Sequence, residues 1–99
     1  MAQNDDDQFF ERADAHIRLS NEQLNGANRS EVSASMLFAT SRFNAWLIAG
    51  GAKSGQEMSE SRDDMIKYFT EQYRLMLEEN INDYIRNYDS YMQPNNDKP

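Results

Sequence analysis

Apolar residues recur along most of this chain at intervals of three and four, the spacing that collects side chains on one face of an α-helix. That spacing predicts three helices: residues 7–24, residues 30–49, and a third helix from Ser54 or Ser59 to Tyr88 or Tyr91. No strand-like alternation persists anywhere in the sequence. The predicted fold is therefore all-α, a three-helix bundle with a long C-terminal helix. The polar ends, residues 1–6 and 92–99, are predicted to be disordered tails around a single helical domain over residues 7–91.

The first predicted helix has a start signal at its N-terminal end and a stop signal at its C-terminal end. The acidic run from Asp5 to Asp7 supplies an N-cap and favourable charge at the positive end of the helix dipole. The apolar stripe of this helix consists of Phe10, Ala13, Ile17 and Leu24. Gly26 follows the stripe, and a glycine at this place can end the helix in the left-handed conformation at little steric cost.

The second predicted helix carries apolar residues on two sides. One broad face comprises Val32, Met36, Ala39, Phe43, Trp46 and Leu47, and the opposite side comprises Ala34, Leu37, Phe38, Ala45, Ile48 and Ala49. A helix that is apolar on two sides is normally central in its fold, with a partner on each side. We therefore expect Trp46 to be largely buried between helices. The sequence offers two alternative N-caps for this helix. One is Ser30, and the other is the pair of Asn28 with Glu31, which has the spacing of a capping box.

The third predicted helix is the longest, and one stripe of mostly apolar residues runs along it without interruption. The stripe consists of Met58, Arg62, Met65, Phe69, Tyr73, Met76, Asn80, Tyr84, Tyr88 and Tyr91. Ser54 with Glu57 has the form of a capping box at the start of this helix, and Ser59 is a competing cap. The first helix is too short to cover the C-terminal end of the third helix. At that end the last three tyrosines of the stripe present their rings along one edge. These tyrosines are predicted to pack against another subunit, most simply in a two-fold homodimer.

Charge and composition exclude several functions. The chain has 17 acidic and 10 basic residues, a net charge of −7, and no basic run of the kind that neutralises nucleic-acid phosphates. It has no cysteine, which removes disulfides, thiolate catalysis and cysteine zinc sites and is compatible with a reducing compartment. The acidic start has no secretory signal, and the longest apolar segment, which contains Arg42 and Asn44, falls short of a spanning helix. We expect a cytoplasmic protein that binds neither nucleic acid nor membrane.

Few polar side chains could form a reactive site. The one histidine, His16, lies outside any Glu-x-x-His motif, and a di-iron bundle needs two such motifs on facing helices. Neighbouring carboxylates such as Asp63 and Asp64 diverge by about 100° on a helix, which is typical of solvated faces rather than acid/base pairs. The sequence contains no calcium loop, phosphate loop or nucleophile elbow. It therefore predicts no catalytic residue, no metal site and no cofactor.

Arg42 and Asn44 lie in the two seams between the apolar sides of the second helix. An arginine in such a seam can pack its methylene stem on apolar neighbours and direct its guanidinium to a carboxylate. Glu71 or Glu78 on the third helix is the expected partner of Arg42. Trp46, four residues after Arg42, is close enough for a cation–π contact. These features predict a structural role for Arg42, with binding of an anion as the alternative.

Three separated segments of the chain agree in order with a known family. They are "FFERADAHIRLSNEQL" from Phe9, "VSASMLFATSRFNAW" from Val32 and "YFTEQYRLMLEENINDYI" from Tyr68. In these segments the chain resembles a small family of acidic, helical bacterial proteins known only as a domain of unknown function. The resemblance implies a bacterial, cytoplasmic, helical protein, and it supplies no catalytic residues.

Two functions from different classes follow from these features. The first is a non-enzymatic small helical protein that acts through protein–protein contact or self-association, because an aromatic overhang and a doubly apolar helix occur without any catalytic constellation. The alternative is a helical bundle with a small polar pocket, lined by His16, Arg42, Asn44 or Glu71, that binds or converts an anionic metabolite. A polar pocket reached by Arg42 would favour the second function, whereas a dry core with Arg42 paired to Glu71 or Glu78 would favour the first.

Overall fold

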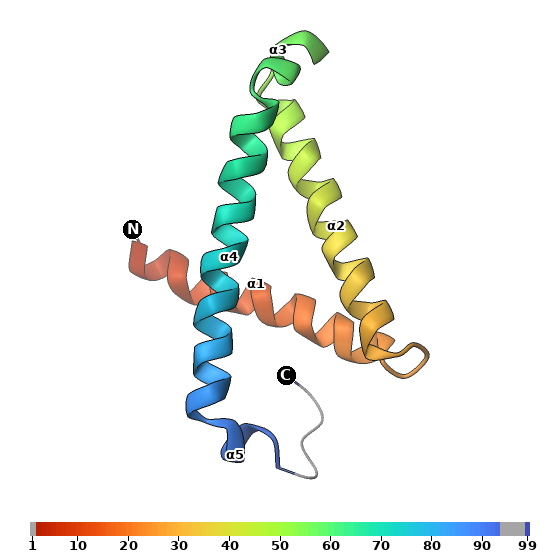
Figure 1. The fold of residues 1–99 in the computed structure, drawn as a ribbon, viewed down its shortest axis with the longest axis vertical. Coiled ribbons are helices and arrows are strands. Elements are labelled where there is room, and N and C mark those ends of the chain that lie inside the picture. The colour runs from red at the N-terminus through yellow and green to blue at the C-terminus, as the bar shows by residue number, and fades with distance from the viewer. Residues whose placement is uncertain (1, 94–98) are drawn as a thin grey trace. The chain divides into compact units, whose positions relative to one another are not determined.

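The structure is a computed structural model that describes residues 2–93 and 99, with the side chains of residues 8–93 and 99. Figure 1 shows the order of its helices: α1 (Ala2–Gln23), α2 (Arg29–Gly50), α3 (Gly55–Glu60), α4 (Arg62–Arg86) and α5 (Tyr88–Tyr91). No strand occurs in the described ranges, so the all-α prediction is confirmed. The chain divides within α2 into two compact units, one ending at Phe43 and the other beginning at Asn44.

The helix α1 begins earlier than predicted. It is helical from Ala2 rather than from Asp7, so the run from Asp5 to Asp7 lies inside the helix instead of capping it. Residues 2–6, part of the predicted N-terminal tail, are therefore helical, and they contain no proline or glycine that would stop a helix. Met1 and residues 94–98 lie outside the described residues, so the disordered C-terminal tail stays a prediction.

In the N-terminal unit, one stripe of the helix α1 is half-buried, and one of its side chains contacts α2. The half-buried positions of this stripe are Ala13, Ile17, Ser20, Asn21 and Leu24. On α2, Val32 is buried at 5% exposure, and Ser20 Oγ lies 3.6 Å from the Met36 sulfur. The predicted stripe is confirmed at three of its four positions. It is wrong at Phe10, whose ring is exposed.

The turn between α1 and α2 ends one helix and caps the next. The Asn28 Oδ1 atom accepts a hydrogen bond from the Glu31 N–H at 2.8 Å, and the Asn28 N–H donates to Glu31 Oε1 at 3.0 Å. These reciprocal bonds confirm the capping pair in preference to Ser30. The predicted left-handed conformation of Gly26 is wrong, because Gly26 has no positive φ. The chain instead leaves α1 through tight turns such as the 3.1 Å bond from the Gly26 N–H to the Gln23 carbonyl.

In the C-terminal unit, the predicted third helix is divided into α3, α4 and α5 by single polar residues. The Ser61 N–H and hydroxyl both donate to the Met58 carbonyl, at 3.2 and 3.1 Å, between α3 and α4. The Asn87 side chain donates to the Asp83 carbonyl at 3.0 Å and to Asp83 Oδ1 at 2.9 Å, between α4 and α5. Short polar side chains that bond to nearby backbone compete with the helical pattern. The prediction of one uninterrupted helix is therefore wrong, and α4, with 25 residues, is its longest part.

Ser54 caps α3 as predicted. Its Oγ atom accepts a hydrogen bond from the Glu57 N–H at 3.1 Å, while Glu57 Oε1 accepts the Lys53 N–H at 2.7 Å. The competing cap, Ser59, lies inside the helix α3. These bonds tie the loop that follows α2 to the first turn of α3, and this loop forms one end of the pocket described below.

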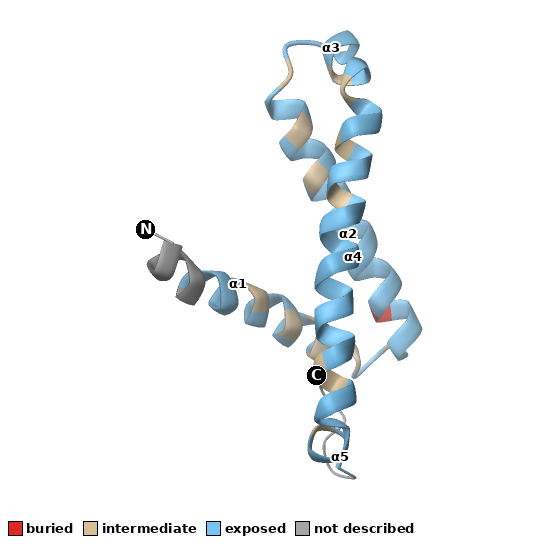
Figure 2. Ribbon diagram, turned by 60° about the vertical axis from the view of Figure 1, so that its left-hand side comes forward, coloured by how far each residue is buried: buried red, intermediate tan, exposed pale blue. Residues whose placement is uncertain are grey.

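Very few side chains are buried. Among the residues whose side chains the structure describes, Val32 alone is buried, and Figure 2 shows almost all others as exposed or intermediate. Trp46 is 67% exposed, so the prediction that it is largely buried between helices is wrong for the single chain. The helix that the sequence marks as central therefore keeps most of its apolar surface open to solvent.

Candidate functional site

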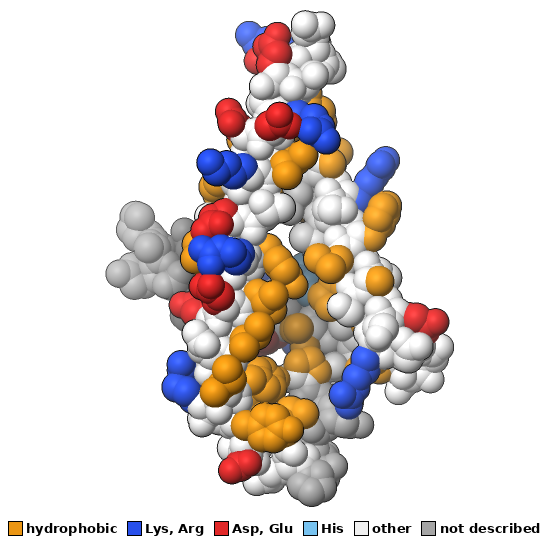
Figure 3. Space-filling view, viewed as in Figure 1, with side chains coloured by type: hydrophobic (Ala, Val, Ile, Leu, Met, Phe, Trp, Pro, Cys, Tyr) orange, Lys and Arg blue, Asp and Glu red, His pale blue; other side chains and the backbone are white. Residues whose placement is uncertain are grey.

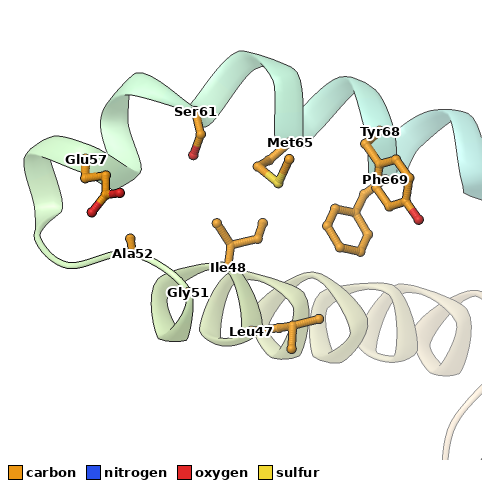
Figure 4. A pocket seen from close by; sticks show the side chains of 9 residues that line it. All are labelled: Leu47, Ile48, Gly51, Ala52, Glu57, Ser61, Met65, Tyr68 and Phe69. Carbon is orange, nitrogen blue, oxygen red and sulfur yellow. The ribbon is translucent and has the colours of Figure 1, made fainter.

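An apolar pocket lies in the C-terminal unit between the end of α2 and the helices α3 and α4. Its volume is about 500 Å³. It is lined by Leu47, Ile48, Gly51, Ala52, Glu57, Ser61, Met65, Tyr68 and Phe69. Figure 4 shows Ile48 on α2 directed toward Met65 and Phe69 on α4, with the Ala52 methyl group at the loop end. A pocket of this volume with mostly apolar walls has room for a large ring or a small ligand.

The polar side chains at the α3 end of the pocket, Glu57 and Ser61, carry hydrogen-bond acceptors, and the Tyr68 hydroxyl on α4 is a further polar group of the lining. One oxygen of the Glu57 carboxylate, Oε1, accepts the Lys53 N–H, and within the described chain the other, Oε2, accepts no hydrogen bond. The Ser61 hydroxyl donates its proton to the Met58 carbonyl and keeps its oxygen as an acceptor. No Lys, Arg or His lines the pocket. Its chemistry therefore suits an apolar group that carries one hydrogen-bond donor rather than an anion.

The four residues predicted for a polar pocket, namely His16, Arg42, Asn44 and Glu71, do not line this pocket. His16 and Arg42 are exposed and belong to the N-terminal unit. Asn44 is half-buried and Glu71 is exposed in the C-terminal unit. The pocket that the structure shows is thus built from other residues, and the polar pocket stays a prediction.

Glu71 and Glu78, the predicted partners of Arg42, pair with Arg74 on their own helix. Arg74 Nη2 lies 2.7 Å from Glu71 Oε2, its Nε lies 3.1 Å from Glu71 Oε1, and its Nη1 lies 2.6 Å from Glu78 Oε2. The hydrogen bond from Arg74 lowers the pKa of Glu71, and the same bond raises the pKa of Arg74. The spacing of three and four residues is the sequence signal for this cluster. Figure 3 shows charged side chains along one side of α4 and hydrophobic side chains along the other.

The three tyrosines of the predicted interface lie in two different environments. The Tyr91 ring meets Tyr84 edge to face at 4.8 Å, and its hydroxyl donates to Asp83 Oδ2 at 3.1 Å. That bond is the main reason why the pKa of Tyr91 is raised. Tyr88 is exposed, whereas Tyr84 and Tyr91 are half-buried. After the helix break at Asn87, Tyr91 packs on Tyr84 and bonds to Asp83, while Tyr88 stays exposed, and the tyrosine interface stays a prediction.

Most of the exposed large apolar residues lie on two helices, α2 and α4. On α2 we call this set the α2 apolar surface: Met36, Leu37, Phe38, Phe43, Trp46 and Leu47, each between 37% and 68% exposed. On α4 a second exposed set comprises Ile66, Tyr68, Tyr73, Leu75, Met76, Leu77, Ile81 and Ile85. Sequence reasoning identified the α2 residues as apolar but expected them to be covered within the chain.

Two further kinds of site are absent from the part of the chain that the structure describes. No three His, Asp or Glu side chains in this part come close enough together to hold a metal ion. None of the described helices combines the length and the apolar character needed to cross a bilayer.

Comparisons with known proteins place the chain in a family. The NMR structure of the protein NB7890A from a Shewanella species has 35% sequence identity and a TM-score of 0.74, over 84% of this chain and 88% of that chain. No curated protein matches the sequence. A family model described as "Protein of unknown function (DUF3144)" matches residues 9–85, which confirms the resemblance to a domain of unknown function. The chain therefore belongs to the family Protein of unknown function (DUF3144).

Proposed function

We propose that this protein is a non-enzymatic helical protein that acts through protein–protein contact, and that its first partner is a second copy of itself. The observation that carries the proposal is the α2 apolar surface, which contains three aromatic rings and lies on a helix that is apolar on two sides. Helices of that kind occur in the interior of folds or assemblies. A single chain that buries only Val32 among its described side chains leaves this helix uncovered.

Four residues of the α2 apolar surface, Met36, Phe43, Trp46 and Leu47, share one broad face of the helix, whereas Leu37 and Phe38 lie on the opposite side. Large side chains of this kind have areas of about 200 Å² each, and these four residues are between 37% and 67% exposed. Together they expose on the order of 400 Å² on that face. The largest apolar patch on a monomer typically covers about 300 to 600 Å² and is often functional. This face has the size of the apolar centre of an interface, which covers about 800 Å² on each partner.

A second copy is the simplest partner that fits this surface. A two-fold interface uses the same patch on both chains, so an apolar patch meets an apolar patch without requiring complementary charge. The proposal extends to the finer architecture, a three-helix bundle with a long C-terminal helix whose open faces a second copy covers. It also includes a cytoplasmic location, which the absence of cysteine supports.

Sedimentation equilibrium tests the proposal. We expect the wild-type protein at high micromolar concentration to have twice the 11.5 kDa mass of one chain. Phe43→Ser removes an exposed ring from the α2 apolar surface and should shift the equilibrium toward monomer. Gln72→Ser, at an exposed polar position of α4, is the matched control and should leave the mass unchanged. A wild-type monomer throughout the micromolar range would refute self-association.

A further inference from the structure

We propose that the pocket between α2, α3 and α4 is the socket for Trp46 of a second copy, and that two copies exchange this side chain reciprocally. The inference rests on the proposed self-association and specifies its central contact. The socket is lined mainly by Leu47, Ile48, Met65 and Phe69, with Glu57 at its polar end. The inserted group is the indole ring of the partner copy.

The position of Trp46 suits a reciprocal contact. Trp46 is 67% exposed and shares one broad face of α2 with Leu47, which lines the socket. In a two-fold interface, a contact from residue i to residue j is always accompanied by the contact from j to i. An exposed ring on the face that borders the socket therefore allows a closed pair, in which each chain supplies one ring and one socket.

The walls of the socket match an indole ring. Its volume of about 500 Å³ admits an aromatic side chain, and the Met65 thioether and the Phe69 ring supply the sulfur–aromatic and aromatic contacts that such a ring makes. A buried indole also needs an acceptor for its N–H, because this group is a donor only. The second oxygen of Glu57 and the Ser61 hydroxyl oxygen stand at the polar end of the socket.

The chemistry of the socket favours this occupant over a small anion or a sugar. The lining contains no cationic side chain that would bind a phosphate or carboxylate. It has few polar groups to satisfy the hydroxyls of a sugar. An aromatic ring with a single donor satisfies both the apolar walls and the acceptors. Tryptophan is also among the residue types enriched at the energetic centre of protein interfaces.

Tryptophan fluorescence combined with sedimentation tests the inference separately from self-association. Trp46 is the only tryptophan in the chain, so its emission reports on one site. We expect the emission to shift to shorter wavelength, and acrylamide quenching to fall, over the same concentration range in which the mass doubles. A dimer whose Trp46 stays fully quenchable would refute the socket and leave self-association intact. A monomer at all concentrations would refute both, whatever the emission of Trp46.

Two variants test the reciprocal exchange. Trp46→Ala removes the ring and keeps the socket, whereas Ala52→Phe fills the socket and keeps the ring. Each variant alone should raise the dissociation constant by at least about 30-fold, as expected for a residue at the centre of an interface. Phe38→Ala, at a ring of equal exposure on the same helix, is the control and should change the dissociation constant less than tenfold.

Mixing the two variants distinguishes a lost contact from a misfolded chain. The heterodimer retains one intact contact, the ring of the Ala52→Phe chain in the socket of the Trp46→Ala chain, and neither homodimer retains any. The mixture should therefore associate at least about tenfold more tightly than either variant alone. Equal dissociation constants for the mixture and the separate variants would overturn the exchange, because a reciprocal contact requires the rescue.

Discussion

The thermal stability of this protein should depend on its concentration. Burial of apolar surface is the dominant favourable term in folding, and among the described side chains only Val32 is buried in the single chain. A chain with so little burial gains little favourable free energy to offset the conformational entropy that is lost on folding. If a second copy covers the α2 apolar surface, folding and association become one equilibrium, and dilution becomes a destabilising perturbation.

The expected size of this effect follows from the chain length. The unfolding entropy of about 2.1 cal/mol/K per residue gives about 0.4 kcal/mol/K for two chains of 99 residues. Each tenfold dilution lowers the stability of a dimer relative to two unfolded chains by about 1.4 kcal/mol. The midpoint of thermal unfolding should therefore fall by about 3 °C per tenfold dilution. Over a hundredfold range the fall should be about 7 °C.

Far-ultraviolet circular dichroism measures this shift, because the described chain is almost entirely helical. Melts should be recorded at a fixed heating rate over a hundredfold range of concentration, with cooling scans to establish that unfolding is reversible. The Trp46→Ala variant is the internal comparison, and its midpoint should vary less because less of it is associated. A wild-type midpoint that stays constant within about 1 °C over this range would contradict the coupling of folding to association.

Three further predictions concern single side chains. Asn28→Ala removes the capping acceptor of α2 and should lower the free energy of unfolding in urea by about 1 kcal/mol, whereas Ser30→Ala should change it by less than about 0.5 kcal/mol. Val32→Ala truncates the buried side chain near the start of α2 and should cost about 2 kcal/mol in the same assay; a negligible loss would contradict its burial. The hydrogen bond to Asp83 raises the pKa of Tyr91, so its stabilising effect is present below the ordinary tyrosine pKa and is lost as the pH rises through the raised value. Tyr91→Phe should remove this alkaline component from a tyrosinate absorbance titration, and an unchanged titration would refute the assignment.

The hydrophobic pattern predicts the helices better than their ends. The second helix, predicted over residues 30–49, is observed as Arg29–Gly50 because a capping pair and two glycines bound a long apolar run. The breaks at Ser61 and Asn87 follow from side chains that bond to the backbone three or four residues earlier. Serine and asparagine also occur inside unbroken helices, so residue type alone does not identify a break.

The candidate site was less accessible to sequence reasoning for a different reason. The ion pairs of Arg74 with Glu71 and Glu78 can be predicted from their spacing in the sequence, because residues three and four apart on one helix are always neighbours. The pocket combines residues from α2, a loop, α3 and α4. It exists only because the chain turns after α2 and brings α3 and α4 opposite the end of that helix. Hydrophobic spacing shows that Ile48 and Met65 are apolar, but it does not show that they face each other across a pocket.

The failed prediction for Trp46 is the most informative of the differences. The sequence pattern shows that both sides of α2 are apolar, and this pattern is typical of a helix with partners on both sides. The single chain leaves Trp46 67% exposed. Under the proposed self-association the two observations agree, because the apolar pattern of a chain reflects burial in its assembled state rather than in the isolated chain. The reasoning that places α2 at the centre would then hold for the dimer, with the indole ring covered by the socket of the second copy.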